Sequence, residues 1–271
     1  MMYLLLQLVS MVSLVFFTIS VSVLFSLYCE KNIIAEEYIQ EFKQFVFPGE
    51  GTSCTDRLSL LCLLLSAFFI PLGSLPSYFY TEYSAFIVMF LFMLSHYFHS
   101  ETLQDYCEKY TLQDVLCFLI FSSFSVYAHF FGIPGKTGSF ESLTLINLWL
   151  ELPPLAVSAM LIFALSFMWL LLSVVYSRDY KNKLYPAVER YISSLIFVAC
   201  FIPFDISFCF KLTGAAAFIC DTVFTLLAAF IIQLMFVWME KRVKDINKKK
   251  NTAFSAVFAG VLLTLISIYI Y

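Results

Sequence analysis

The sequence predicts an all-α, polytopic integral membrane protein that forms a single transmembrane domain over residues 1–271. Hydrophobic residues make up 61% of the chain and charged residues only 13%, about half the charged share of a typical soluble domain. Apolar runs alternate with short polar loops, and several runs approach the roughly 20 residues that a helix needs to cross a bilayer. Too few basic residues lie outside these loops to favour nucleic-acid binding.

We predict about eight spanning helices, and the first, without a basic segment before it, is expected to be a retained span rather than a cleaved signal peptide. Glu82 and His96 limit the third span, and Pro153–Pro154 suit the start of the fifth. The predicted spans are 3–28, 58–76, 83–99, 114–132, 153–176, 191–210, 213–239 and 252–271.

Residues 31–46, in the loop after the first span, have a different pattern. Apolar residues recur at helical spacing from Ile34 to Val46, while Glu, Gln and Lys residues fill the other face, and Pro48–Gly49 follow. This is typical of an amphipathic helix lying in the membrane interface or against a partner. Its acidic polar face favours a partner subunit over anionic lipid.

The basic residues are divided very unevenly between the two sides of the predicted bundle. The loops after spans 1, 3, 5 and 7 hold 14 of the 16 Lys and Arg residues, and the other side holds only Lys136 and Lys211. Basic loops stay on the cytoplasmic side of a membrane. We therefore expect a multi-pass protein of the cytoplasmic (inner) membrane, with these four loops inside and both termini outside.

Acidic residues within predicted spans are candidates for ion transfer, because an ionised group in hydrocarbon is costly. Asp205 and Asp221 lie at similar depths in spans 6 and 7, and Glu240 lies at the inner end of span 7. They could form a relay for protons or cations. The alternatives are hydrogen bonding between helices for the two Asp residues and an interfacial pair with Lys244 for Glu240.

The remaining reactive residue types give weaker signals. His96 and His99 near the inner end of span 3 could carry protons or could simply be solvated at the interface. The eight Cys residues form no CxxC pair and fit small buried hydrophobes. Since no nucleophile–base pair, phosphate-binding loop or metal signature appears, we expect no directly bound cofactor or metal and no enzyme acting alone.

The predicted topology resembles the membrane subunit shared by respiratory complex I, its NADH dehydrogenase subunit 1, and energy-converting nickel–iron hydrogenases of the formate hydrogenlyase type. In the loop between spans 5 and 6, Arg178 and Glu189 fall on the Arg and the second Glu of the hydrogenase-branch pattern. The chain departs from that pattern at Val175, Tyr180 and Asn182, where the pattern has Glu, Pro and Asp.

The first inner loop and the end of the chain carry the rest of this resemblance. Tyr38 and Lys43 match the family's first-loop segment, with Glu36 and Gln40 in its Gln and Asp places, and Glu240 precedes a basic run and a last helix. The resemblance implies that inner loops 1, 3 and 5 dock a hydrophilic electron-transfer arm. The docking and coupling residues would be Tyr38, Lys43, Arg178 and Glu189, and the ion relay would be Asp205, Asp221 and Glu240.

The resemblance also implies the setting of the protein. Iron–sulfur and nickel–iron centres would lie in hydrophilic hydrogenase or dehydrogenase subunits, antiporter-like membrane subunits would be neighbours, and quinone is a possible ligand. The main alternative is a stand-alone proton- or cation-coupled secondary transporter using Asp205 and Asp221, although no inverted repeat is visible. A lipid-modifying enzyme is a third interpretation, and it lacks the clustered His or Asp residues such enzymes need.

Overall fold

The computed structural model describes residues 2–29, 35–47, 54–70, 84–100, 102–130, 152–174, 183–202, 210–240 and 246–271. Within these ranges every regular element is a helix, which confirms the all-α prediction. The elements are α1 (Met2–Cys29), α2 (Ala35–Val46), α3 (Cys54–Ser66), η1 (Ala67–Phe69), α4 (Ser84–His99), α5 (Leu103–Lys109), α6 (Thr111–Phe130), α9 (Pro154–Val174), α10 (Leu184–Phe201), α12 (Gly214–Glu240) and α13 (Ile246–Ile270).

Three helical segments are long and apolar enough to cross a membrane, which supports the prediction of a membrane protein. They are Leu184–Phe201, Ala215–Trp238 and Asn251–Ile270, and shorter apolar helices lie at Val12–Tyr28, Ser84–His99, Thr111–Ser123 and Pro154–Leu170. Each of the eight ranges predicted as spans overlaps a described helix. The number of helices that actually cross remains a prediction.

Helix α10 begins at Leu184, seven residues before residue 191, where we expected the sixth span to start. The charged pair Glu189–Arg190 suggested a loop, yet Glu189 is buried inside the helix. Pro186 did not prevent an early start, because the first turn of a helix needs no intrahelical partner for its N–H groups.

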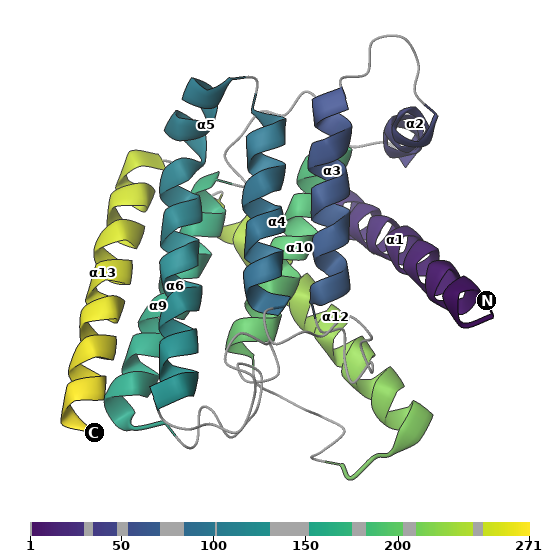
Figure 1. Ribbon diagram of the computed structural model, residues 1–271. Helices are drawn as coiled ribbons and strands as arrows, with labels where there is room; N and C mark the ends of the chain where they lie inside the picture. The colour runs from purple at the N-terminus through teal and green to yellow at the C-terminus, as the bar shows by residue number, and fades with distance from the viewer. Residues whose placement is uncertain are drawn as a thin grey trace.

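The helices form a bundle with α10 at its centre (Figure 1). In this view helices α4, α6, α9 and α13 are roughly upright, whereas α1 and α12 run obliquely toward the right-hand side. The end of α4 and the starts of α3, α6, α10 and α13 lie at the upper end of the view, where α2 and α5 also lie. Consecutive upright helices therefore run in opposite directions, and charged residues near their termini are brought together at this end.

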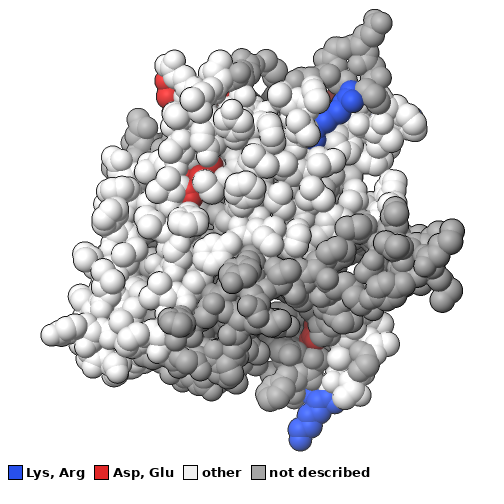
Figure 2. Space-filling model, viewed as in Figure 1, with Lys and Arg blue, Asp and Glu red and all other residues white. Residues whose placement is uncertain are grey.

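The described part of the surface seen in Figure 2 carries few charged side chains. On the face seen in Figure 2, coloured side chains are few, with blue and red atoms near the top and bottom and some red atoms within a wide white area. The described exposed residues include many Leu, Ile, Val and Phe side chains on α1, α12 and α13. Such a surface suits contact with lipid acyl chains.

Candidate functional site: a histidine between two carboxylates

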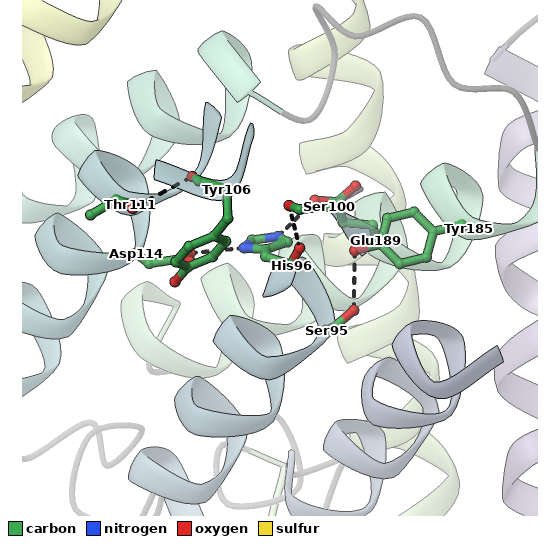
Figure 3. A network of polar contacts seen from close by, with 8 residues as sticks. All are labelled: Ser95, His96, Ser100, Tyr106, Thr111, Asp114, Tyr185 and Glu189. Atoms are coloured by element: carbon green, nitrogen blue, oxygen red, sulfur yellow. Dashed lines mark hydrogen bonds and ion pairs between the residues drawn. The ribbon is translucent and has the colours of Figure 1, made fainter. Parts of the chain in front are cut away.

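Among the described residues, a cluster of buried polar side chains lies where α4 ends and α6 and α10 begin. His96, in the last turn of α4, has Nδ1 2.8 Å from Oδ1 of Asp114 and Nε2 3.0 Å from Oε1 of Glu189. All three side chains are buried. Figure 3 shows the imidazole between the two carboxyl groups, one from α6 and one from α10. We call these three residues the histidine bridge.

Aromatic rings hold the imidazole in place. Tyr110 stacks on it with ring centroids 4.4 Å apart, and Phe92, one turn earlier on α4, meets it edge-on at 4.6 Å. These contacts fix the ring plane, so both nitrogens point along the line between the carboxylates. Asp114 is set by the helix start, since its backbone N–H donates to the carbonyl of Tyr110 at 3.0 Å.

Tyr106 lies at the outer side of the bridge, on the short helix α5. Its hydroxyl donates to Oδ2 of Asp114 at 2.9 Å, so both oxygens of that carboxylate are hydrogen-bonded. Burial, and then the Asp114 carboxylate beside it, raise the pKa of the Tyr106 phenol. Tyr106 therefore stays protonated near neutral pH and acts as a donor that separates Asp114 from the surroundings.

A second chain of hydrogen bonds runs beside the bridge. The hydroxyl of Ser95 donates to the carbonyl of Ser59 at 2.9 Å and lies 3.1 Å from the hydroxyl of Tyr185. The ring of Tyr185 stacks on His99 with centroids 4.0 Å apart and an interplanar angle of 2°. Tyr185 is one helical turn before Glu189, so this contact fixes the same part of α10 that supplies a carboxylate to the bridge.

The bridge can pass a proton without moving a side chain. An ionised carboxylate only accepts hydrogen bonds. Both contacts therefore form together in two ways: the ring carries both protons as an imidazolium, or one carboxyl group keeps a proton and donates it to the ring. These arrangements contain the same number of protons. A proton can thus move from one carboxyl group to the opposite one through the ring, and this leaves the ring's remaining proton on the other nitrogen.

The two carboxylates of the histidine bridge do not converge on one point. The two carboxylates engage different nitrogens of one ring and so lie on opposite sides of it. In the part of the chain that the structure describes, no group of three or more His, Cys, Asp or Glu side chains is arranged to hold a metal ion. The expectation that His96 could be a solvated interfacial residue was wrong, because the ring is completely buried.

The predicted relay residues do not join this cluster. Asp221 is buried on the second turn of α12, whose first residues lie at the opposite end of the bundle (Figure 1). Asp205 lies outside the described residues. Glu240 is the last residue of α12, and its side chain is outside the described part of the structure.

The predicted docking residues are found in different settings. Tyr38 is buried on α2 and Lys43 is exposed in the last turn of the same helix. Glu189 was expected in a loop facing partner subunits, and it is instead a buried member of the histidine bridge. Arg178 lies outside the described residues.

Sequence reasoning missed the bridge because its three members lie at the ends of apolar runs. Each can be read as an ordinary interfacial charge when its helix is considered alone. A signal was nevertheless present: His96, Asp114 and Glu189 lie within about two turns of the inner ends of neighbouring predicted spans. Groups placed in this way meet when the helices pack side by side.

No protein-family model matches this chain, and no curated protein sequence matches it significantly.

Proposed function

We propose that this protein moves protons at the inner end of a membrane helix bundle, with the histidine bridge as its proton-carrying element. The observation that carries this proposal is a fully buried imidazole with a carboxylate on each nitrogen. Buried ionisable groups inside a membrane bundle are costly, and proton pathways use such groups. A proton is the ion that suits this site, because an imidazole binds protons and gives Na⁺ no additional oxygen ligand.

The bridge runs across the bundle rather than along it, because its members come from three neighbouring helices at one end. It would carry protons sideways, from Asp114 beside Tyr106 toward Glu189 in the central helix α10. Asp221 on α12 is a buried acid near the opposite end. Together with Asp205 and Glu240, it is our proposed continuation of the path through the membrane.

In the fuller version of the proposal, the chain is the membrane-anchoring and ion-translocating subunit of a redox complex. The resemblance of residues 31–46 and 178–189 to the complex I and energy-converting hydrogenase family supports it. This version has eight spans, both termini outside and a cytoplasmic membrane location. Loops 1, 3 and 5 would dock hydrophilic subunits that carry the iron–sulfur and nickel–iron centres.

The proton-carrying proposal is tested with the purified full chain in liposomes. A potassium gradient with valinomycin sets the potential, and a pH-sensitive dye inside the vesicles reports proton entry. We expect measurable flux for the unchanged protein, and a loss of at least tenfold in His96→Asn and in Glu189→Gln. Glu108→Gln is the control, since this residue is exposed and does not belong to the bridge.

Equal flux in His96→Asn and in the unchanged protein would contradict the role of the bridge. Absence of flux in every variant, including the unchanged chain, would show that the chain does not translocate protons by itself. In that case the same comparison is made after co-purification with the subunits that accompany it. Far-UV circular dichroism and the gel-filtration profile establish that each variant is folded before its flux is compared.

Purification in mild detergent with mass spectrometry separates the redox subunit from a stand-alone transporter. Co-purifying iron–sulfur or nickel–iron subunits would support the first. A stable protein without such subunits, but with flux that depends on His96, would support a proton-coupled transporter.

A further inference from the structure

The N-terminal end of α10 is held by a different helix. The side chain of Lys183, the residue before α10, does not cap the helix. Instead the carboxylate of Glu41, on α2, accepts the backbone N–H of Lys183 at 2.9 Å from each oxygen and the N–H of Leu184 at 2.6 Å. A residue more than 140 positions earlier in the chain therefore supplies the cap.

This contact satisfies most of the free donors at that helix end. The N–H of Ala187 already donates to the carbonyl of Lys183 at 3.3 Å, and Pro186 has no N–H. Of the three remaining groups, on residues 183, 184 and 185, Glu41 accepts two. A carboxylate is also favoured here by the partial positive charge of a helix N-terminus.

Two further contacts hold α2 in this position. The ring of Phe42 meets Phe16 of α1 edge-on at 5.8 Å, and the side chain of Tyr38 is buried in the same core as α10. Glu37 forms an ion pair with the ammonium group of Lys183, although both side chains are more than two-fifths exposed and the pair adds little. Helix α2 is thus fixed to the bundle by apolar packing and attached to α10 by Glu41.

We propose that Glu41 is a positioning residue for the histidine bridge, so that α2 sets the proton-carrying contact from the inner surface. The proposal rests on the proposed function for its biological meaning. Glu189 lies five residues beyond Leu184, about 7.5 Å along the helix at a rise of ~1.5 Å per residue. A shift of the helix end therefore moves Glu189 relative to His96. It also moves Tyr185, which stacks on His99 and contacts Ser95.

The first test observes the bridge directly and does not depend on transport. The chain has three His residues, so a protein labelled with ring-¹⁵N histidine gives few nitrogen signals, and those of His96 are identified by their loss in His96→Asn. We expect Glu41→Ala to shift the His96 ring signals, because the Nε2 contact with Glu189 changes. Glu36→Ala, an exposed position on the same helix, is the matched control and is expected to leave them unchanged.

Unchanged His96 signals in a folded Glu41→Ala protein would overturn the proposal. If Glu41→Ala does not fold, Glu41→Met replaces it, because Met keeps the length of the side chain and removes the acceptor oxygens. An absence of shift in the folded Met variant would overturn the proposal equally.

The second test measures proton flux in liposomes, where Glu41→Ala is expected to lower the flux severalfold and Glu41→Gln to retain part of it. The two proposals can fail separately. If His96→Asn does not change flux, the proposed function is wrong, while the nitrogen signals still decide whether Glu41 positions the bridge. If His96→Asn abolishes flux and Glu41→Ala leaves both flux and signals unchanged, only the positioning role is wrong.

Discussion

Helix α10 and the last two helices, α12 and α13, all satisfy the same length and hydropathy criteria for a membrane span, yet they occupy opposite environments. In α10, 94% of the segment Leu184–Phe201 is buried within the protein, against 28% of Ala215–Trp238 and of Asn251–Ile270. Protein surrounds the first, and lipid is the expected neighbour of most of the other two. The central helix is also the least apolar of the three.

The difference shows where a membrane protein can place polar chemistry. Helix α10 buries Glu189, Ser193 and Ser194 together with its apolar residues, because neighbouring helices can supply hydrogen-bond partners that lipid cannot. Helices α12 and α13 turn Leu, Ile and Phe side chains outward. The position of a helix in the bundle thus decides whether a charged residue on it can persist.

The largest effect is expected when the histidine bridge loses its imidazole ring. In His96→Leu, the Asp114 and Glu189 carboxyl groups stay buried without their shared partner. Removing one member of a buried charged cluster typically costs about 3–5 kcal/mol. Unfolding by a rising SDS fraction in dodecyl maltoside micelles measures this cost.

A triple variant tests the cause of that loss. Replacing His96, Asp114 and Glu189 together by Leu removes the charges and retains apolar volume, and such replacements are often neutral or stabilising. We therefore expect most of the stability to return while proton flux stays absent. A triple variant as unstable as the single one would show that shape rather than charge holds this end of the bundle.

The second prediction compares packing in the two environments. Ile192 on α10 is buried, whereas Leu262 on α13 is exposed. Truncation of a buried Ile or Leu to Ala costs about 2–5 kcal/mol because a cavity remains. We expect Ile192→Ala to lose stability in this range and Leu262→Ala to lose less than about 1 kcal/mol, because lipid can fill the space. Equal losses in SDS titrations would contradict the central position of α10.

The comparison also explains what could be predicted from sequence. Long apolar runs indicate helices whether protein or lipid surrounds them. The all-α class and the approximate positions of the helices could therefore be predicted from composition and pattern. The start of α10 could not be predicted from the sequence, because the charged pair Glu189–Arg190 is typical of a loop. Glu189 is instead buried in the helix, where His96 of α4 is its partner. A single sequence does not state which helices are neighbours, and contacts such as Glu41 with Leu184 depend on that information.

The third prediction concerns the only glycine contact described on α13, at its packing against α9. A Cβ atom added to Gly260 would lie 2.5 Å from a ring carbon of Phe163, a side chain that is itself buried. Overpacking of this kind costs about 1–3 kcal/mol. Gly260→Ala should therefore lose stability in this range, while Ala259→Val, next to it on the exposed side, should change little. If Gly260→Ala leaves the stability unchanged, α13 packs against Phe163 of α9 more loosely than this distance indicates.

The smallest effect is expected at Tyr106, at the edge of the bridge. Tyr106→Phe removes the hydroxyl that donates to Asp114, and loss of one hydrogen bond typically costs about 1 kcal/mol. The pKa of Tyr106 is raised in the folded state, first by burial and then by Asp114. Because the folded protein holds this proton more tightly, the stability it provides is complete below the ordinary tyrosine pKa of about 10 and is lost as the pH rises above that value.

The midpoint of thermal unfolding, measured from pH 7 to 11 in micelles, tests this argument. Unchanged protein and Tyr106→Phe should differ by a constant amount up to about pH 10, and the difference should shrink at higher pH, because the phenol loses its proton first in the unfolded chain. An absence of any difference would show that the ring, which Tyr106→Phe retains, rather than the hydroxyl supports Asp114. In that case Tyr106 would protect the bridge by packing alone, and the hydrogen-bonded line would end at Asp114.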